Sequence, residues 1–152
     1  MDGMYALLAL SAGFVFFFSI IGLVFYVLKS YGLYKLAVAR NIEYSWLAWI
    51  PCGDLYIIGK LIGKLSIASY EIPMIEIVLP AASIISSAFS GVTLIGPLLV
   101  IANLILFFFA LYKLYKIYVS DKAELWLILS IIFAFLIPIF IFLIKDNRPT
   151  EV

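Results

Sequence analysis

Residues 77–112 read IVLPAASIISSAFSGVTLIGPLLVIANLILFFFALY and carry no charged side chain over 36 positions. One helix of that length would be about 54 Å long, whereas the hydrocarbon core of a bilayer is about 30 Å thick. The segment must therefore fold back on itself. Gly91 and the pair Gly96-Pro97 mark the break, because glycine relaxes the backbone and proline favours a helix start. We expect two membrane spans here, at about residues 72–90 and 97–119.

Two more apolar segments lie outward of this stretch. Residues 5–28 form an uncharged run of 24 residues, which is about 36 Å long as a helix. Residues 125–144 form an uncharged run of 20 residues, about 30 Å long, in which we expect Pro138 to introduce a kink. The sequence thus predicts an all-α integral membrane protein with four transmembrane helices, folded as a single membrane domain over residues 1–152.

Composition supports the membrane class and excludes several kinds of site. Hydrophobic residues make up 66% of the chain, against about 45–50% in soluble domains. The chain has no histidine and one cysteine, Cys52, which excludes histidine-based triads and the common zinc ligand sets. No phosphate loop, nucleophile elbow or dinucleotide fingerprint is present. We therefore predict no enzymatic activity, no catalytic or metal-binding residue and no cofactor, and the absence of a basic arm predicts no nucleic-acid partner.

The segment between the first two spans is harder to interpret. Residues 31–50 mix apolar side chains with Lys35, Arg40 and Glu43, and residues 55–68 are apolar except for Lys60 and Lys64. Each piece is too short and too charged to cross a bilayer comfortably. We predict an amphipathic two-helix loop over about residues 31–68, interfacial or re-entrant, with a turn at residues 51–54. Whether residues 47–68 lie on, dip into or cross the membrane stays open.

Charge placement predicts an orientation in the cytoplasmic membrane. With four spans, loops 29–71 and 113–124 carry eight basic residues, and the C-terminal tail carries the other two. The positive-inside rule then places both loops in the cytoplasm and both termini outside. If residues 55–68 formed a fifth span, the count would be near five against five. The rule therefore favours four spans.

A set of short motifs resembles a known group of proteins. These motifs are YGLYKLA at 31–37, Ile42, WLAWIP at 46–51, DLYIIGK at 54–60, and IPIFIFLI followed by KDNR at 137–148. Together they resemble small multi-spanning membrane proteins of Gram-positive bacteria, over roughly residues 31–148. The resemblance implies a bacterial membrane protein and draws attention to the loop at 31–68, and it implies no catalytic residue.

Six residues of that loop form a candidate interface with lipids or a partner. Trp46 and Trp49 are three apart, so on a helix they share one face. They would form a docking surface, or an aromatic belt at the headgroups. The small residues Gly59 and Gly63 would let another helix approach closely. Beside them, Lys60 and Lys64 would bind anionic headgroups, or form the wet face of an interfacial helix.

A second candidate is a polar path inside the membrane. It consists of five residues in the second and third spans: Glu76, Ser83, Ser87, Ser90 and Asn103. The first four share one helical face, and an acid within a span suggests an ion or proton path. The structural alternatives are an ion pair of Glu76 with a loop lysine, a packing seam of serines, and an interhelical hydrogen bond from Asn103.

The sequence therefore predicts a non-enzymatic membrane scaffold or accessory subunit. Its partners would be membrane lipids and other membrane proteins, or further copies of itself. The alternative is a channel or transporter element with a polar path near Glu76.

Overall fold

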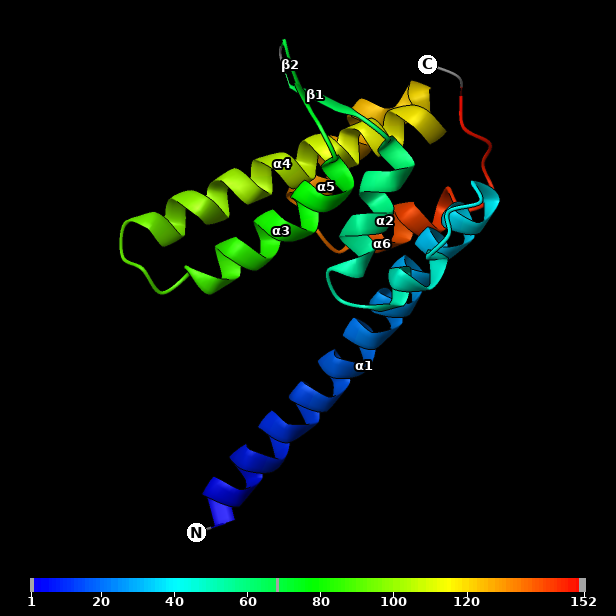
Figure 1. The fold of residues 1–152 in the computed structure, drawn as a ribbon. Helices are drawn as coiled ribbons and strands as arrows, with labels where there is room; N and C mark the ends of the chain where they lie inside the picture. Colours follow the sequence, from blue (N-terminus) through cyan, green and yellow to red (C-terminus); the bar gives the residue numbers. More distant parts are fainter. Residues whose placement is uncertain (1, 68, 151–152) are drawn as a thin grey trace.

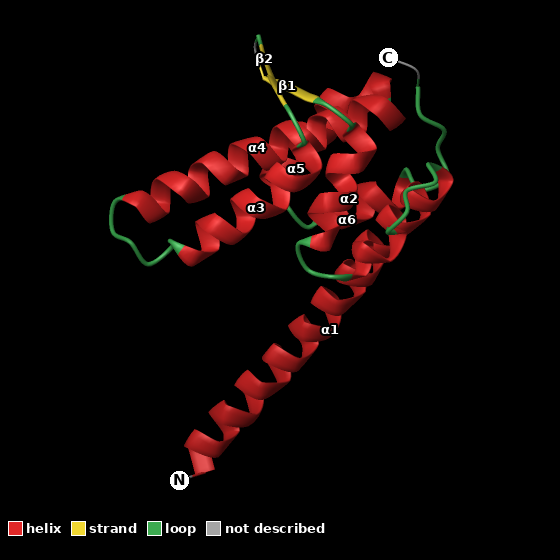
Figure 2. Ribbon diagram, viewed as in Figure 1, coloured by secondary structure: helices red, strands yellow, loops and turns green. Residues whose placement is uncertain are grey.

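A computed structural model describes residues 2–67 and 69–150, and the ribbon is mostly helical (Figure 2). Two helices are long and apolar enough to cross a membrane, Gly3–Ala39 and Ile95–Tyr118. The elements in chain order are α1 Asp2–Ala39, the 3-10 helix η1 Ser45–Trp49, α2 Gly53–Ile62, β1 Leu65–Ile67, β2 Tyr70–Ile72, α3 Ile75–Ala88, α4 Ile95–Tyr118, the 3-10 helix η2 Ser120–Lys122, α5 Ala123–Ile132 and α6 Leu136–Leu143.

Helix α1 has 38 residues, which corresponds to about 57 Å. It continues eleven residues beyond the predicted end of the first span at residue 28, up to Ala39. Its N-terminal half extends away from the rest of the molecule as a single arm (Figure 1), and every residue from 3 to 20 is exposed. Its C-terminal half packs against α6, η1 and α2. At Gly32 an added Cβ would lie 2.8 Å from the carbonyl oxygen of Ile141, so the absence of a side chain permits the contact with α6.

The predicted two-helix loop is wrong in its details. Residues 31–39 belong to α1, the tryptophans lie in the short helix η1, and only α2 is a full α-helix of the loop. Helix α2 ends before Gly63, whose φ of +69° terminates it. An antiparallel hairpin follows, in which Leu65 pairs with Ile72 and Ser66 with Glu71. The all-α prediction therefore missed a two-stranded sheet within this segment.

The fold-back within residues 77–112 is confirmed. Helices α3 and α4 lie side by side and are joined by a turn at residues 89–94 (Figure 1). An added Cβ at Gly96 would lie 2.6 Å from the carbonyl oxygen of Phe89, so glycine is needed to close this turn. Pro97 lies in the first turn of α4, where the missing N–H is tolerated. The second span was predicted to begin at residue 72, but that residue belongs to β2, and helix α3 begins at Ile75.

The predicted fourth span is not one helix. Residues 125–144 contain most of α5 and all of α6, which are separated by a break at residues 133–135. Pro138 lies in the first turn of α6 and so does not kink a longer helix. After α6 the chain returns to the end of α4, where Asn147 Nδ2 donates to the carbonyl oxygen of Tyr118 over 3.2 Å and Thr150 N donates to that of Ile117 over 2.7 Å. Phe140 of α6 stacks on Trp126 of α5, so the two short helices fold back on each other as a hairpin.

The core lies among the C-terminal halves of α1 and α4, α2 and α6. Trp126 of α5 and Phe140 of α6 stack with ring centroids 4.4 Å apart, and Tyr115 of α4 meets both rings edge-on. The hydroxyl of Tyr115 forms a 3.0 Å hydrogen bond with that of Ser130. These aromatic contacts join α4, α5 and α6 at the base of their hairpin.

Candidate functional site

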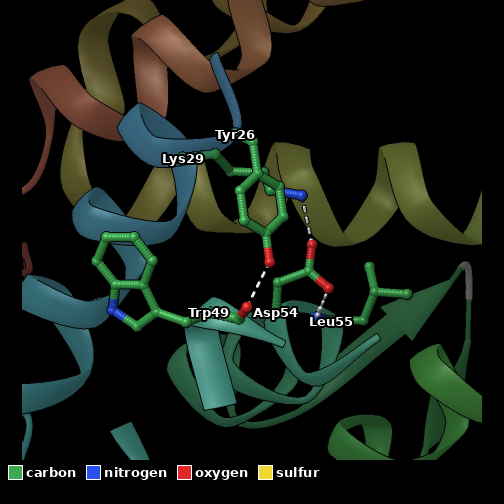
Figure 3. Close-up of polar contacts among 5 residues, drawn as sticks. All are labelled: Tyr26, Lys29, Trp49, Asp54 and Leu55. Atoms are coloured by element: carbon green, nitrogen blue, oxygen red, sulfur yellow. Dashed lines mark hydrogen bonds and ion pairs between the residues drawn. The ribbon is translucent and has the colours of Figure 1, made fainter. Parts of the chain in front are cut away.

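A polar junction fixes the loop segment onto α1 (Figure 3). Lys29 Nζ lies 2.5 Å from Asp54 Oδ2, and Asp54 Oδ1 accepts the backbone N–H of Leu55 over 2.9 Å. The Tyr26 hydroxyl donates to the carbonyl oxygen of Trp49. Both charged side chains are largely buried, and each has a partner. The junction therefore holds η1 and the start of α2 in a fixed position beside α1.

Trp46 and Trp49 lie one turn apart on η1. Their residues are 55% and 39% exposed, and residues three apart on a 3-10 helix lie on the same side. Figure 3 shows that the indole of Trp49 points away from the junction that holds its carbonyl group. The structure thus presents two indoles from a segment whose backbone is fixed.

The two glycines of the candidate interface have different roles. An added Cβ at Gly59 would overlap the backbone of Glu76, so Gly59 permits α2 to contact the start of α3. Gly63 faces open space and is needed for its positive φ at the end of α2. The close approach at Gly59 is therefore made within this chain, and this glycine offers no open docking surface.

The two lysines of the candidate interface also have different partners. Lys60 Nζ lies 3.2 Å from Glu76 Oε1, and this hydrogen bond and charge raise the pKa of Lys60 above its ordinary value. Lys64 Nζ lies 3.7 Å from Glu71 Oε2 across the β-hairpin, and both of these side chains are exposed. Glu76 is therefore paired at the very start of α3.

The remaining residues of the predicted polar path are divided between different contacts. Ser83 and Asn103 exchange hydrogen bonds of 3.3 and 3.2 Å between α3 and α4. Ser87 and Ser90 are exposed, and the Ser90 hydroxyl donates to the Ser87 carbonyl oxygen over 2.8 Å. The buried serine of α3 is Ser86, which the sequence interpretation did not select. The five residues therefore do not gather into one site.

A basic cavity that the sequence interpretation missed lies between α1, β1 and α4. It encloses about 720 Å³, and its basic lining residues are Arg40, Lys113 and Lys116. The rest of its wall is formed mostly by apolar side chains of α2, β1 and α4, together with Gly63 and Ser66, and residues 149 and 150 complete the lining. Of the predicted site residues, only Gly63 lines it. Lys113 and Lys116 are three apart on α4, but Arg40 comes from the end of α1, so no local pattern could reveal that all three line one cavity.

A second, apolar groove adjoins this cavity. It encloses about 600 Å³ between α4 and α5, and Phe109 and Tyr112 line both hollows. Its other lining residues are Ile105, Phe108, Glu124, Leu127, Ile128 and Ile131. The basic cavity and the apolar groove therefore form two adjoining hollows, which are basic at one end and apolar at the other.

Comparison with protein-family models, with curated proteins and with solved structures finds no match for this chain. The resemblance drawn from residues 31–148 therefore stays a prediction.

Proposed function

We propose that this chain is a membrane-embedded, non-enzymatic scaffold or accessory subunit, and that the arm of α1 is its contact with another membrane helix. The observation that carries the proposal is the exposure of every residue from 3 to 20 in a helix that is apolar on all sides. So large an apolar surface is unfavourable in water and is typical of an interaction with lipid or protein. A helix that is apolar all round belongs within a membrane or a core.

The arm has a feature that suits a protein neighbour better than lipid alone. A shallow hollow of about 420 Å³ runs along it, lined by Ala9, Leu10, Gly13, Phe14 and Phe17. Ala9 and Gly13 are one turn apart, and small residues at this spacing let a second helix approach closely in a bilayer. The exposed indoles of Trp46 and Trp49 belong to the segment held beside Tyr26 and Lys29, where the uncharged part of α1 ends, and they suit the headgroup level there.

The arrangement of the helices favours a membrane topology that differs from the four-span prediction at its C-terminal end. All ten basic residues lie between Lys29 and Arg148, in elements that meet where α1 and α4 end. The end of α6 lies beside α1, where Gly32 meets the backbone of Ile141 and the rings of Tyr31 and Phe142 are 6.2 Å apart, so the tail begins near the C-terminal end of α1. Helices α5 and α6 are about 15 and 12 Å long and fold back on each other, whereas α3, which at about 21 Å is also shorter than the bilayer core, continues into the uncharged turn at residues 89–94 that joins it to α4. We therefore favour three crossings by α1, α3 and α4 plus a re-entrant α5–α6 hairpin, with the C-terminal tail on the cytoplasmic side, over four crossings.

The alternative function, a channel or transporter element, receives less support. Glu76 is neutralised by Lys60, and Ser83 is occupied by Asn103. A conducting path would need these groups to face a continuous water-filled space.

The test compares two glycines of α1 that meet nothing else among residues 2–67 and 69–150, Gly13 in the hollow and Gly22 outside it. A photoreactive residue replaces Leu10, and crosslinking is carried out in native membranes. We expect one discrete protein adduct, weakened by Gly13→Leu and unchanged by Gly22→Leu, because leucine fills the hollow only at position 13. Crosslinking to lipid alone would contradict the scaffold role and leave membrane embedding intact.

The topology is tested separately with single cysteines in a Cys52→Ser background. Cysteines at Lys122 and Thr150 should both resist an impermeant thiol reagent added to intact cells. Labelling at Thr150 alone would support four crossings instead.

A further inference from the structure

The basic cavity has the charge expected of an anion site. Three cationic side chains line it, and no acidic side chain of the described residues does. Lys113 and Lys116 are three apart on α4 and share a face with Phe109 and Tyr112, while Arg40 approaches from the end of α1. None of the three forms an ion pair within residues 2–67 and 69–150.

Two of the three cationic groups, those of Arg40 and Lys116, are held by the fold. The Arg40 guanidinium donates from Nη1 to the carbonyl oxygen of Leu61 over 3.3 Å and lies 5.7 Å from the ring centroid of Tyr118. The Lys116 ammonium lies 5.9 Å from the ring centroid of Tyr112. Each contact uses only part of the cation's hydrogen-bonding capacity, because a guanidinium has five N–H donors and an ammonium three. The remaining donors are free to bind phosphate oxygens.

The adjoining groove has the shape and chemistry of a site for an acyl chain. Its α4 wall runs from Ile105 to Tyr112, two residues seven positions apart, or about 10 Å along the helix axis. Its opposite wall is the apolar face of α5, and its one charged residue, Glu124, lies in the first turn of α5 beside the end of α4. The apolar end of the groove therefore points away from the charged end of the molecule.

We infer that the cavity of Arg40, Lys113 and Lys116 binds the phosphate of an anionic glycerophospholipid, one acyl chain of which lies in the groove between α4 and α5. Basic pockets between membrane helices on the cytoplasmic side bind such headgroups. The inference rests on the membrane embedding proposed above and is independent of the partner contact at the α1 arm. A free phosphate would use the same cations, but the adjoining apolar groove selects the lipid.

The headgroup is tested by native mass spectrometry of the purified full-length chain released from micelles. Phosphatidylglycerol and phosphatidylcholine with the same acyl chains are added in equal amounts. We expect the protein to retain phosphatidylglycerol preferentially, and the triple variant R40Q/K113Q/K116Q to reduce that preference about tenfold. The matched control K35Q/K122Q/R148Q removes the same charge outside the cavity and should retain the preference. Equal loss in both variants, or no preference in the unaltered protein, would overturn the inference.

The acyl chain is tested without changing charge. Ile131 lines the groove and its neighbour Ile132 does not, although the two are similarly exposed, at 55% and 63%. We expect Ile131→Trp to fill the groove and reduce lipid retention about fivefold, and Ile132→Trp to leave it unchanged. Excess glycerol 3-phosphate should not displace the lipid. Full displacement, or identical behaviour of the two tryptophan variants, would identify a phosphate site and contradict a lipid site.

These outcomes stay separate from failure of the proposed function. A chain that does not float with liposomes would contradict the membrane embedding itself. A chain that floats but shows no lipid preference would contradict only the inferred site. If the triple variant does not fold, judged by circular dichroism, the isoleucine pair and the lipid preference of the unaltered protein still decide.

Discussion

The two halves of α1 are built from similar apolar residues but meet different surroundings. From residue 3 to 20 every side chain is exposed, whereas Leu33, Leu36 and Ala37 are buried against the rest of the fold. Glycines occur in both halves, yet only Gly32 faces another part of the chain at close range. The apolar side chains of α1 therefore decide only that the helix avoids water. The shape of its surface, at Gly32 above all, decides where the rest of the chain packs against it.

The largest expected effect contrasts glycines from the two halves. Gly32→Val should destabilise the protein by about 3 kcal/mol, because the new side chain meets backbone of α6 that cannot move aside cheaply. Gly13→Val carries the same change in helix propensity without a neighbour and should fall within about 0.5 kcal/mol of the unaltered protein. Reversible unfolding in mixed micelles measures both. Equal costs would show that the arm packs as tightly as the body.

The junction in Figure 3 gives the next effect. Asp54→Ala leaves the Lys29 ammonium without its carboxylate, and since both groups are largely buried the expected cost is about 2 kcal/mol. Lys29→Met/Asp54→Ala should recover part of that loss, since no unpaired charge remains. A double variant no more stable than Asp54→Ala would mean that water already solvates the lysine.

A smaller effect is expected inside the aromatic cluster. Tyr115→Phe removes one hydrogen bond to Ser130, whose hydroxyl keeps its 2.7 Å bond to the Trp126 carbonyl oxygen. The expected loss is about 1 kcal/mol in the same unfolding assay. Tyr5→Phe, in the exposed arm, is the matched control and should change nothing measurable.

The smallest effect concerns Lys60 and Glu76. The Lys60 side chain is 40% exposed, so Lys60→Met should cost only about 0.5 kcal/mol after solvent screening. Because the folded-state pKa of Lys60 is raised, its contribution is complete below the unfolded pKa and is lost as pH rises through the folded pKa. The difference between the two proteins should therefore be constant from about pH 7 to 9 and shrink at higher pH. A difference that already disappears near pH 8 would contradict the pairing.

The sequence by itself determined the apolar character of the chain and the fold-back within residues 77–112. Length against bilayer thickness requires the turn, and the pair Gly96-Pro97 locates its end because only glycine fits beside the Phe89 carbonyl group. The sequence also singled out Glu76 of α3 and Asn103 of α4. It offered an ion pair of Glu76 with a loop lysine only as an alternative, and it assigned Ser83, the partner of Asn103, to a polar path.

Only the tertiary structure decided the path of residues 123–150 and the existence of the basic cavity. The break at residues 133–135 lies in the apolar sequence Phe-Ala-Phe, and the local signal nearest to it is Pro138, which predicts a disturbed helix four residues earlier but not the direction that the chain takes afterwards. It forms where α6 turns back to bring Phe140 onto Trp126, a contact between residues that local spacing does not relate. The cavity likewise requires Arg40 and Lys116, which are far apart in the sequence, to line the same space. Such contacts depend on the packing of whole helices, and apolar helices present many equivalent faces, so hydropathy alone does not choose among them.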